Sequence, residues 1–270
     1  MRSSRLVWVA VSLTAVIALF GCSAPAPTGG STPGPNAGDT PSASPTVDAD
    51  FSEISVYYPI ALGNTWTYRM DYYGFNDVGI VVMTETVTEL TPVADGVRVL
   101  IDRTFHHENG LFPDSTESLE FTFHDDGSAT VPYLAYPPDS GVMANLYQVT
   151  VSGGDVSWPT VSDFEAGTPA TSTVTASLSS GELTFGESVA VSATGEGTEP
   201  ITVAAGTFTA RRLRQDIVAT VIGQGAVPSS VTTWLAEGVG PVHTSVVDEV
   251  FGSEVVTVDL VEFVPGPSAG

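Results

Sequence analysis

Apolar and polar residues alternate along short runs of the chain from Phe51 onward, and many of the apolar residues are aromatic or β-branched. Between Leu119 and Phe123, for example, the odd positions are apolar and the even positions are polar. A period of two is typical of a strand that buries one face. On this pattern we predict strands at residues 65–73, 78–90, 96–107, 116–125, 129–135, 146–152, 171–178, 186–194, 199–205, 208–222, 229–236, 241–250 and 254–264.

Two of these runs also indicate how their faces are used. In residues 96–107 one face is apolar and carries Val97, Val99, Ile101 and Phe105. In residues 254–264 both faces are apolar, with one formed by Val256, Val258 and Leu260 and the other by Val255, Val261 and Phe263. We therefore expect the last run to be a central strand that is covered on both sides.

The predicted fold is an all-β domain. Turn-forming dipeptides separate the runs, and a helical period of 3.6 is scarce. Residues 51–58 and 139–146 are the only candidate helices. We expect one antiparallel β domain over residues 51–264 with at most one or two short helices.

Two parts of this range differ from the rest. Residues 137–200 are rich in Ser, Thr, Gly and acidic residues, and they form either an excursion from the main sheet or a second small β unit. Residues 265–270 are short and poor in apolar side chains, so we expect a disordered tail.

The charge balance excludes one class of partner. The chain has 31 acidic residues against eight basic ones, all of them Arg, and its formal net charge at pH 7 is −23. Binding to nucleic acid requires clustered positive charge, which is absent here, so no nucleic-acid partner is expected. The same excess argues against a domain that lies flat on anionic lipid.

The single cysteine, Cys22, follows a basic start and an uncharged run over residues 6–20, as in a secretory signal. With Leu19 three positions before it and Gly21 directly before it, Cys22 resembles the lipidation site of a bacterial lipobox. Phe20 is bulkier than the residue that usually stands there. The resemblance implies that residues 1–21 are removed and that a diacylglycerol is attached to Cys22.

The predicted location is therefore the extracytoplasmic face of the cell membrane, with the lipid as anchor. Residues 22–50 are almost wholly Pro, Gly, Ser, Thr and Ala, and we expect them to form a disordered tether. Two alternatives remain: an uncleaved membrane helix, for which the apolar run is short, and a cysteine that happens to follow a cleavage site for soluble secretion.

Three segments resemble a pattern found in uncharacterised bacterial exported proteins and lipoproteins: residues 58–68 (YPIALGNTWTY), 201–208 (ITVAAGTF) and 233–242 (TWLAEGVGPV). The chain departs from the pattern at Ala204, where Pro is usual. These proteins are similar to half-barrel lipoprotein carriers, and the resemblance implies a curved antiparallel sheet around an apolar cavity. The candidate residues for lining that cavity are Trp66, Tyr68, Phe208 and Trp234. The alternative is that they are core aromatics.

The other candidate sites are weaker. Arg212 and Arg214 would share a strand face and could receive a carboxylate or phosphate group, or they could pair with nearby acidic residues. His107 and His124 would lie more than 20 Å apart on neighbouring strands, at about 3.3 Å per residue, so we expect no metal site. No motif for catalysis or for a cofactor is present.

We therefore expect a non-enzymatic protein without a cofactor that binds an apolar ligand or lipid, is anchored to the membrane through its N-terminal lipid and is a monomer. Two alternatives differ in class. The first is a cell-surface structural or interaction protein whose sheet is filled by its own side chains. The second is a hydrolase without a recognisable motif.

Overall fold

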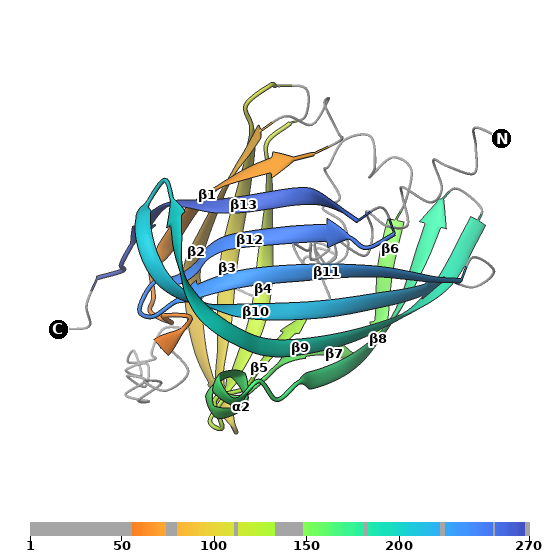
Figure 1. The fold of residues 1–270 in the computed structure, drawn as a ribbon, viewed down its shortest axis with the longest axis horizontal. Coiled ribbons are helices and arrows are strands. Elements are labelled where there is room, and N and C mark those ends of the chain that lie inside the picture. The colour runs from red at the N-terminus through yellow and green to blue at the C-terminus, as the bar shows by residue number, and fades with distance from the viewer. Residues whose placement is uncertain are drawn as a thin grey trace, which may run out of the picture.

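A computed structural model describes residues 56–73, 80–110, 113–132, 148–180, 183–221, 225–250 and 252–267. These residues form one antiparallel sheet of 13 strands that curls into a nearly closed barrel (Figure 1), which confirms the predicted all-β class and curved antiparallel sheet. Cys22, the rest of residues 1–55 and residues 268–270 lie outside this description. No helix in the described ranges is long and apolar enough to cross a membrane.

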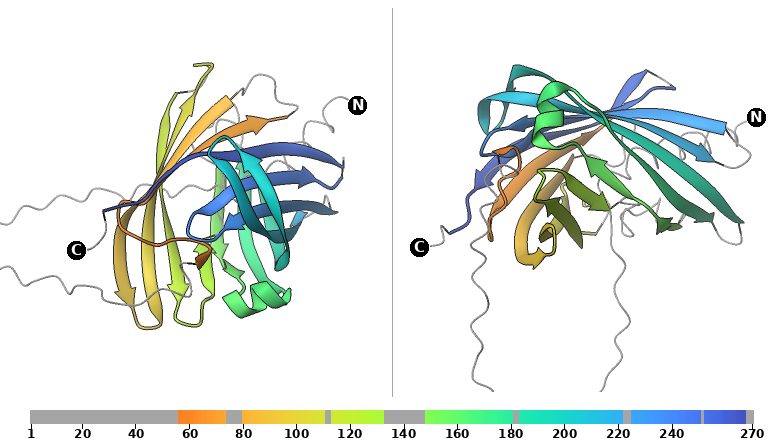
Figure 2. Two further views of the ribbon diagram at one scale, coloured as in Figure 1. Left: turned by 60° about the vertical axis from the view of Figure 1, so that its left-hand side comes forward. Right: turned by 90° about the horizontal axis from the view of Figure 1, so that it is seen from below.

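The elements follow one another in this order: β1 Thr65–Tyr72, β2 Ile80–Val93, β3 Gly96–His107, β4 Ser115–His124, β5 Ala129–Pro132, β6 Gln148–Gly153, β7 Asp155–Trp158, α2 Val161–Ala166, β8 Ala170–Ser180, β9 Leu183–Val203, β10 Gly206–Val221, β11 Gly225–Ala236, β12 Gly240–Asp248 and β13 Ser253–Val264. Figure 2 shows β2–β4 and β10–β13 as opposite walls of the barrel. The first and last strands, β1 and β13, are neighbours in the sheet.

Three elements differ from the prediction. β7 and α2 were not expected, because four and six residues are too few to show a period. The predicted strands 186–194 and 199–205 are one strand, β9, whose pairing with β10 continues across a bulge opposite Arg212. The candidate helix 139–146 and residues 51–55 of the other candidate lie outside the described residues.

One segment joins the two ends of the sheet. β6 pairs with β8 at one end of the strand order, whereas β7, which begins two residues after β6 ends, pairs with β5 at the other end. Gly154 makes this change of partner possible, because its φ is +86° and an added Cβ would lie 2.3 Å from Thr173 O. The described part of residues 137–200 thus contributes its strands to this same sheet.

The last strand is central, between β12 and β1, but the reading of its two faces is wrong. Val255 is the extra residue in a bulge against β12, and Val261 is the extra residue in a bulge against β1. The second bulge shifts the alternation by one residue, so Phe263 joins Leu260 on the inner face. Val261 is 41% exposed. Apolar residues at both parities therefore reflect two bulges rather than two covered faces.

The segment that leads into β1 and the end of β13 are fastened together by Asn64. Its side chain donates to Pro59 O at 2.8 Å and accepts from Gly266 N at 2.7 Å. Asn64 is 3% exposed. This segment and α2 lie at the same end of the barrel (Figure 1), where Tyr57 packs edge-on against Phe164 with ring centroids 5.0 Å apart. Asn64, in the segment 58–68 that resembles the exported-protein pattern, therefore joins the residues before β1 to the residues after β13.

Candidate functional site

A row of five side chains crosses the inner face of the barrel. The register pairs Phe263 with Trp66, Trp66 with Glu85, Glu85 with Arg103 and Arg103 with Glu117. Because residues directly opposite each other in a sheet share a face, all five point to the same side. The row thus begins with two aromatic rings on β13 and β1 and ends with three charged groups on β2, β3 and β4.

The charged part of the row is a buried ion-pair network. Arg103 Nε lies 2.5 Å from Glu85 Oε1, and Arg103 Nη1 lies 3.5 Å from Glu117 Oε1. The three residues are 4–7% exposed. Burial disfavours the charge on Arg103, but the two carboxylates outweigh it and raise the pKa of the guanidinium. One cation faces two glutamates here, and its removal would leave both of them buried without this partner.

Buried tyrosines surround this network. Tyr58 packs on Trp66 with ring centroids 5.3 Å apart, and burial together with the nearby Glu85 raises its pKa far above the usual value. Burial raises the pKa of Tyr68 in the same way, again with Glu85 contributing. The pKa of Tyr72 is raised by burial and by Glu117. All three phenols are therefore neutral hydrogen-bonding groups beside the carboxylates.

The sequence carried a signal for this network that the prediction missed. Glu85 lies on the same face of β2 as Val81, Met83 and Val87, each of which is buried. Arg103 likewise continues the apolar face of β3, and Glu117 begins that of β4. A charged residue in the apolar register of three successive strands indicates a buried polar cluster.

Other polar atoms on the inner face lack a partner. Among the described residues, Tyr68 Oη, Gln215 Nε2 and Ser229 Oγ are buried without a hydrogen bond. Gln215 and Ser229 belong to the buried faces of the neighbouring strands β10 and β11. Buried polar groups in folded proteins are nearly always paired, so each such atom requires an explanation.

The four predicted cavity residues do not come together. Trp66 and Tyr68 are buried on the inner face, at 0% and 3% exposure. Trp234 is half-buried elsewhere. Its ring centroid lies 4.7 Å from that of His243 with the ring planes tilted by 55°, and its Nε1 donates to Glu199. Phe208 lines a surface groove beside the β9–β10 hairpin. Trp66 Nε1 donates to Val239 O, which fits the alternative of a core aromatic.

An apolar pocket lies where the N-terminal segment meets α2 and the sheet. Tyr57, Tyr58, Trp158, Phe164 and Leu213 are among its walls, and its volume is about 50 Å³. Ligand pockets for drug-sized molecules measure about 300–1,000 Å³. The pocket in its present form therefore holds no more than a small group.

Each of three histidines has an aspartate beside it. The Nδ1 atoms of His106, His124 and His243 lie 2.9, 3.1 and 2.6 Å from Asp114, Asp95 and Asp259. The strands of His107 and His124, β3 and β4, are antiparallel neighbours, and His124 lies opposite Gly96, at the far end of β3 from His107. Within the described part of the chain, no group of three or more His, Cys, Asp or Glu could hold a metal ion.

His124 also has a hydroxyl partner, which gives the order Asp95–His124–Thr130 of a hydrolytic triad. His124 Nε2 lies 2.8 Å from Thr130 Oγ1. A triad acts with a buried acid and with free N–H groups for an oxyanion. The Asp95 side chain is 72% exposed. The nearby backbone N–H groups already donate within the turn, namely those of His124, Asp125, Gly127 and Ser128. The arrangement is a polar hairpin end.

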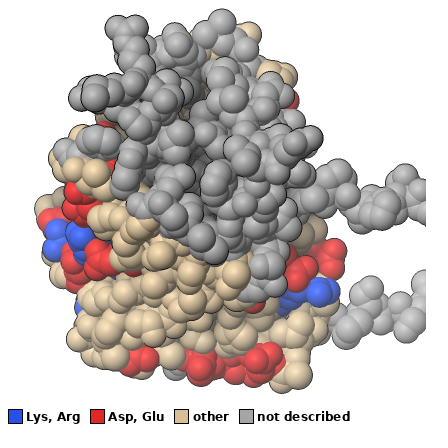
Figure 3. All heavy atoms as spheres, turned by 90° about the vertical axis from the view of Figure 1, so that its right-hand side faces the viewer, with Lys and Arg blue, Asp and Glu red and all other residues tan. Residues whose placement is uncertain are grey.

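The predicted anion patch is occupied by acidic residues. Arg212 Nε lies 3.1 Å from Glu196, and Arg214 Nη2 lies 2.8 Å from Asp216. On the face shown in Figure 3, the basic atoms in view likewise lie beside acidic ones.

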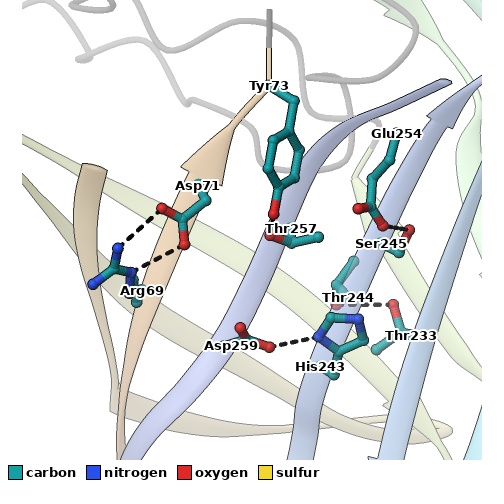
Figure 4. Close-up of polar contacts among 10 residues, drawn as sticks. All are labelled: Arg69, Asp71, Tyr73, Thr233, His243, Thr244, Ser245, Glu254, Thr257 and Asp259. Atoms are coloured by element: carbon teal, nitrogen blue, oxygen red, sulfur yellow. Dashed lines mark hydrogen bonds and ion pairs between the residues drawn. The ribbon is translucent and has the colours of Figure 1, made fainter. Parts of the chain in front are cut away.

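Figure 4 shows similar short-range pairing across β1, β13 and β12, including Arg69 with Asp71. Arg212 and Arg214, the two predicted anion-binding residues, thus both have carboxylate partners within the protein itself.

Two solved structures share this fold. One is a candidate lipoprotein from Parabacteroides distasonis, with 17% identity, coverage of 77% of this chain and 98% of its own, and a TM-score of 0.56. The other is a candidate exported protein with a YmcC-like fold from Bacteroides fragilis, with 12% identity, coverage of 78% and 99%, and a TM-score of 0.51. Identities this low establish the fold alone. No family model and no curated protein matches the chain.

The ion-pair network generates a stability prediction. Arg103→Met leaves Glu85 and Glu117 buried without their cation, and we expect a loss of about 3–5 kcal/mol in the free energy of unfolding. Replacing all three residues by apolar ones of similar size is expected to cost far less. Urea unfolding measures both. Arg98→Met, which removes an exposed pair with Glu120, is the control and is expected to cost at most about 1 kcal/mol. Equal losses for Arg103→Met and Arg98→Met would contradict the network.

The buried tyrosines generate a prediction for alkaline pH. Their folded pKa lies above the unfolded value of about 10, so their contribution to stability is complete below about pH 10 and is lost as the pH rises further. For Tyr58 and Tyr68 together, we expect the free energy of unfolding to fall by nearly 3 kcal/mol per pH unit above about pH 10.5.

Urea unfolding between pH 9 and 11 measures this slope. Tyr58→Phe is expected to reduce the slope by about 1.4 kcal/mol per pH unit, and Tyr73→Phe, at a residue that is 47% exposed, is the matched control. A slope that is the same in the Tyr58→Phe variant and the unmodified chain would show that this phenol is not held neutral by the fold.

Proposed function

We propose that this protein is a lipid-anchored, monomeric lipoprotein of the extracytoplasmic face that binds an apolar ligand with a polar end inside its barrel, without transforming it. The lipobox-like sequence at Cys22 supports the anchor, and two proteins of the same fold are described as a candidate lipoprotein and a candidate exported protein. The inner face, apolar over most of its area, supports the nature of the ligand.

The observation that carries the proposal is the set of buried inner-face atoms without a partner, Tyr68 Oη, Gln215 Nε2 and Ser229 Oγ. A barrel filled only by its own side chains gains nothing from leaving such atoms unpaired, since each costs about 1–3 kcal/mol. A ligand hydroxyl or carbonyl that reached Tyr68 would remove that cost. The apolar remainder of the ligand would lie against the valines and aromatics of the same wall.

The small pocket sets a condition on this function. A volume of about 50 Å³ does not admit an alkyl chain, so binding requires the inner side chains to rearrange. The same observation favours a second candidate, a surface interaction protein with a packed interior. The two functions differ in whether a ligand enters the barrel.

Native mass spectrometry of the full-length chain, purified from membranes, distinguishes them. We expect a co-purified adduct, or a one-to-one complex with added dodecan-1-ol, whose hydroxyl can pair with Tyr68. Tyr68→Phe is expected to weaken the complex about fivefold, which is the value of about one hydrogen bond. The control Tyr73→Phe, whose hydroxyl lies 3.2 Å from Thr257 Oγ1, is expected to have no effect. A chain that carries no adduct and takes up no dodecan-1-ol is an interaction protein instead.

The anchor has its own test. Because Cys22 is the only thiol, Cys22→Ala leaves no residue that can accept a diacylglycerol through sulfur. We expect the variant to move from the membrane fraction to the soluble fraction when cells are fractionated. Cys22→Ser is a closer match in shape and is expected to behave in the same way. Unchanged membrane retention of both variants would contradict lipidation at this residue.

A further inference from the structure

A groove of about 410 Å³ lies on the surface beside the β9–β10 hairpin, and its volume is within the usual range for ligand sites. Thr198 and Arg211 line it from directly opposite positions on β9 and β10. Thr209, two residues before Arg211, points to the same side. Tyr57 lines both this groove and the small apolar pocket.

Arg211 differs from the other arginines that the structure describes. Five of the six, Arg69, Arg98, Arg103, Arg212 and Arg214, have a carboxylate within 4.0 Å. Arg211 has none in the described residues, although the chain carries 31 acidic residues. In so acidic a protein, an arginine without a carboxylate partner is the exception, and this one opens onto a groove.

The protein holds the Arg211 guanidinium in place without neutralising it. Nη2 donates to the carbonyl oxygen of Glu165 at 2.5 Å, and the guanidinium lies 5.3 Å from the centroid of the Phe164 ring. A carbonyl and a ring face orient a cation but leave its charge uncompensated. Nε is buried and has no hydrogen-bond partner among the described residues. An oriented arginine cation without a carboxylate partner among the described residues therefore borders the groove.

We propose that this groove binds a small molecule that carries a carboxylate, with Arg211 as the charge partner of that carboxylate. A guanidinium matches the planar geometry of a carboxylate, and such charge-assisted hydrogen bonds are about twice as strong as neutral ones. The hydroxyls of Thr198 and Thr209 stand on the same side as further donors, and Phe208 supplies an apolar wall for the remainder of the ligand.

The acidic residues nearby restrict where the carboxylate lies. Glu237 lines the groove, and both Glu165 and Glu237 act on Tyr57, whose pKa is raised by burial and then by these two carboxylates. Tyr57 accordingly stays protonated and adds no negative charge to the wall. The ligand carboxylate is bound at the Arg211 end, and an uncharged part of the ligand lies beside Glu237.

This site is tested with hexanoate, by saturation-transfer NMR on the full-length chain in detergent. We expect saturable binding of hexanoate that depends on Arg211, whereas any binding of hexan-1-ol, which has the same chain length without the charge, is expected to be independent of Arg211. Arg211→Met keeps an apolar stem over Phe164 and is expected to weaken hexanoate binding at least tenfold. Arg214→Met is the matched control, because it removes the same charge from the same strand but at a residue that pairs with Asp216.

Unchanged hexanoate affinity in Arg211→Met, or an equal loss of hexanoate and hexan-1-ol binding in that variant, would overturn the proposal. If Arg211→Met does not fold, Arg211→Lys answers the same question, since a lysine keeps the charge but loses the planar fork, and a hexanoate affinity below that of the unmodified chain is expected. The result is independent of dodecan-1-ol binding inside the barrel, because Tyr68, the proposed partner of that hydroxyl, does not line the groove.

Discussion

The register of β13, β1, β2, β3 and β4 is the constraint on which the interior depends. It places Glu85, Arg103 and Glu117 directly opposite one another, so that each buried charge meets its partner. A slip of one residue would turn every side chain of a strand to the other face. Such a slip would expose apolar residues and would also separate the charges of the network. The ion pairs thus make the correct register the only one in which both the apolar and the charged residues of these strands are accommodated.

Much of this architecture could be predicted from local sequence. The alternation in β3 and β4 identified the buried positions Val97, Val99 and Leu119 correctly. In a half-buried strand, neighbouring residues point to opposite faces, so the buried face can be recognised from the local sequence. The same rule failed in β13. Val255 and Val261 are extra residues in bulges that shift the alternation of inner and outer positions, and nothing in the local sequence indicates these bulges. The pairing of β5 with β7 depends on a change of partner at Gly154, and no pattern within four residues reveals it.

The sites were harder to predict than the fold, for two reasons. Three charged residues occupy positions of the apolar, buried face of their strands: Glu85, Arg103 and Glu117. A prediction of the core that considers apolar residues alone does not include them. Among the three clustered arginines, the strand pattern could place Arg212 and Arg214 on one face, yet it could not show that both face acidic residues. The orientation of the Arg211 guanidinium depends on its contacts with Glu165 and Phe164, which are remote in sequence and could not be predicted from it.

The segment over residues 148–158 has a consequence for association between copies of the chain. An unpaired strand edge invites pairing with a neighbouring molecule. Here both outermost strands, β6 with six residues and β7 with four, belong to this one segment. The two outermost strands are thus short, and Gly154 between them prevents the two from forming one long straight template. The same peptide that joins the two ends of the sheet keeps its outermost strands short and divided.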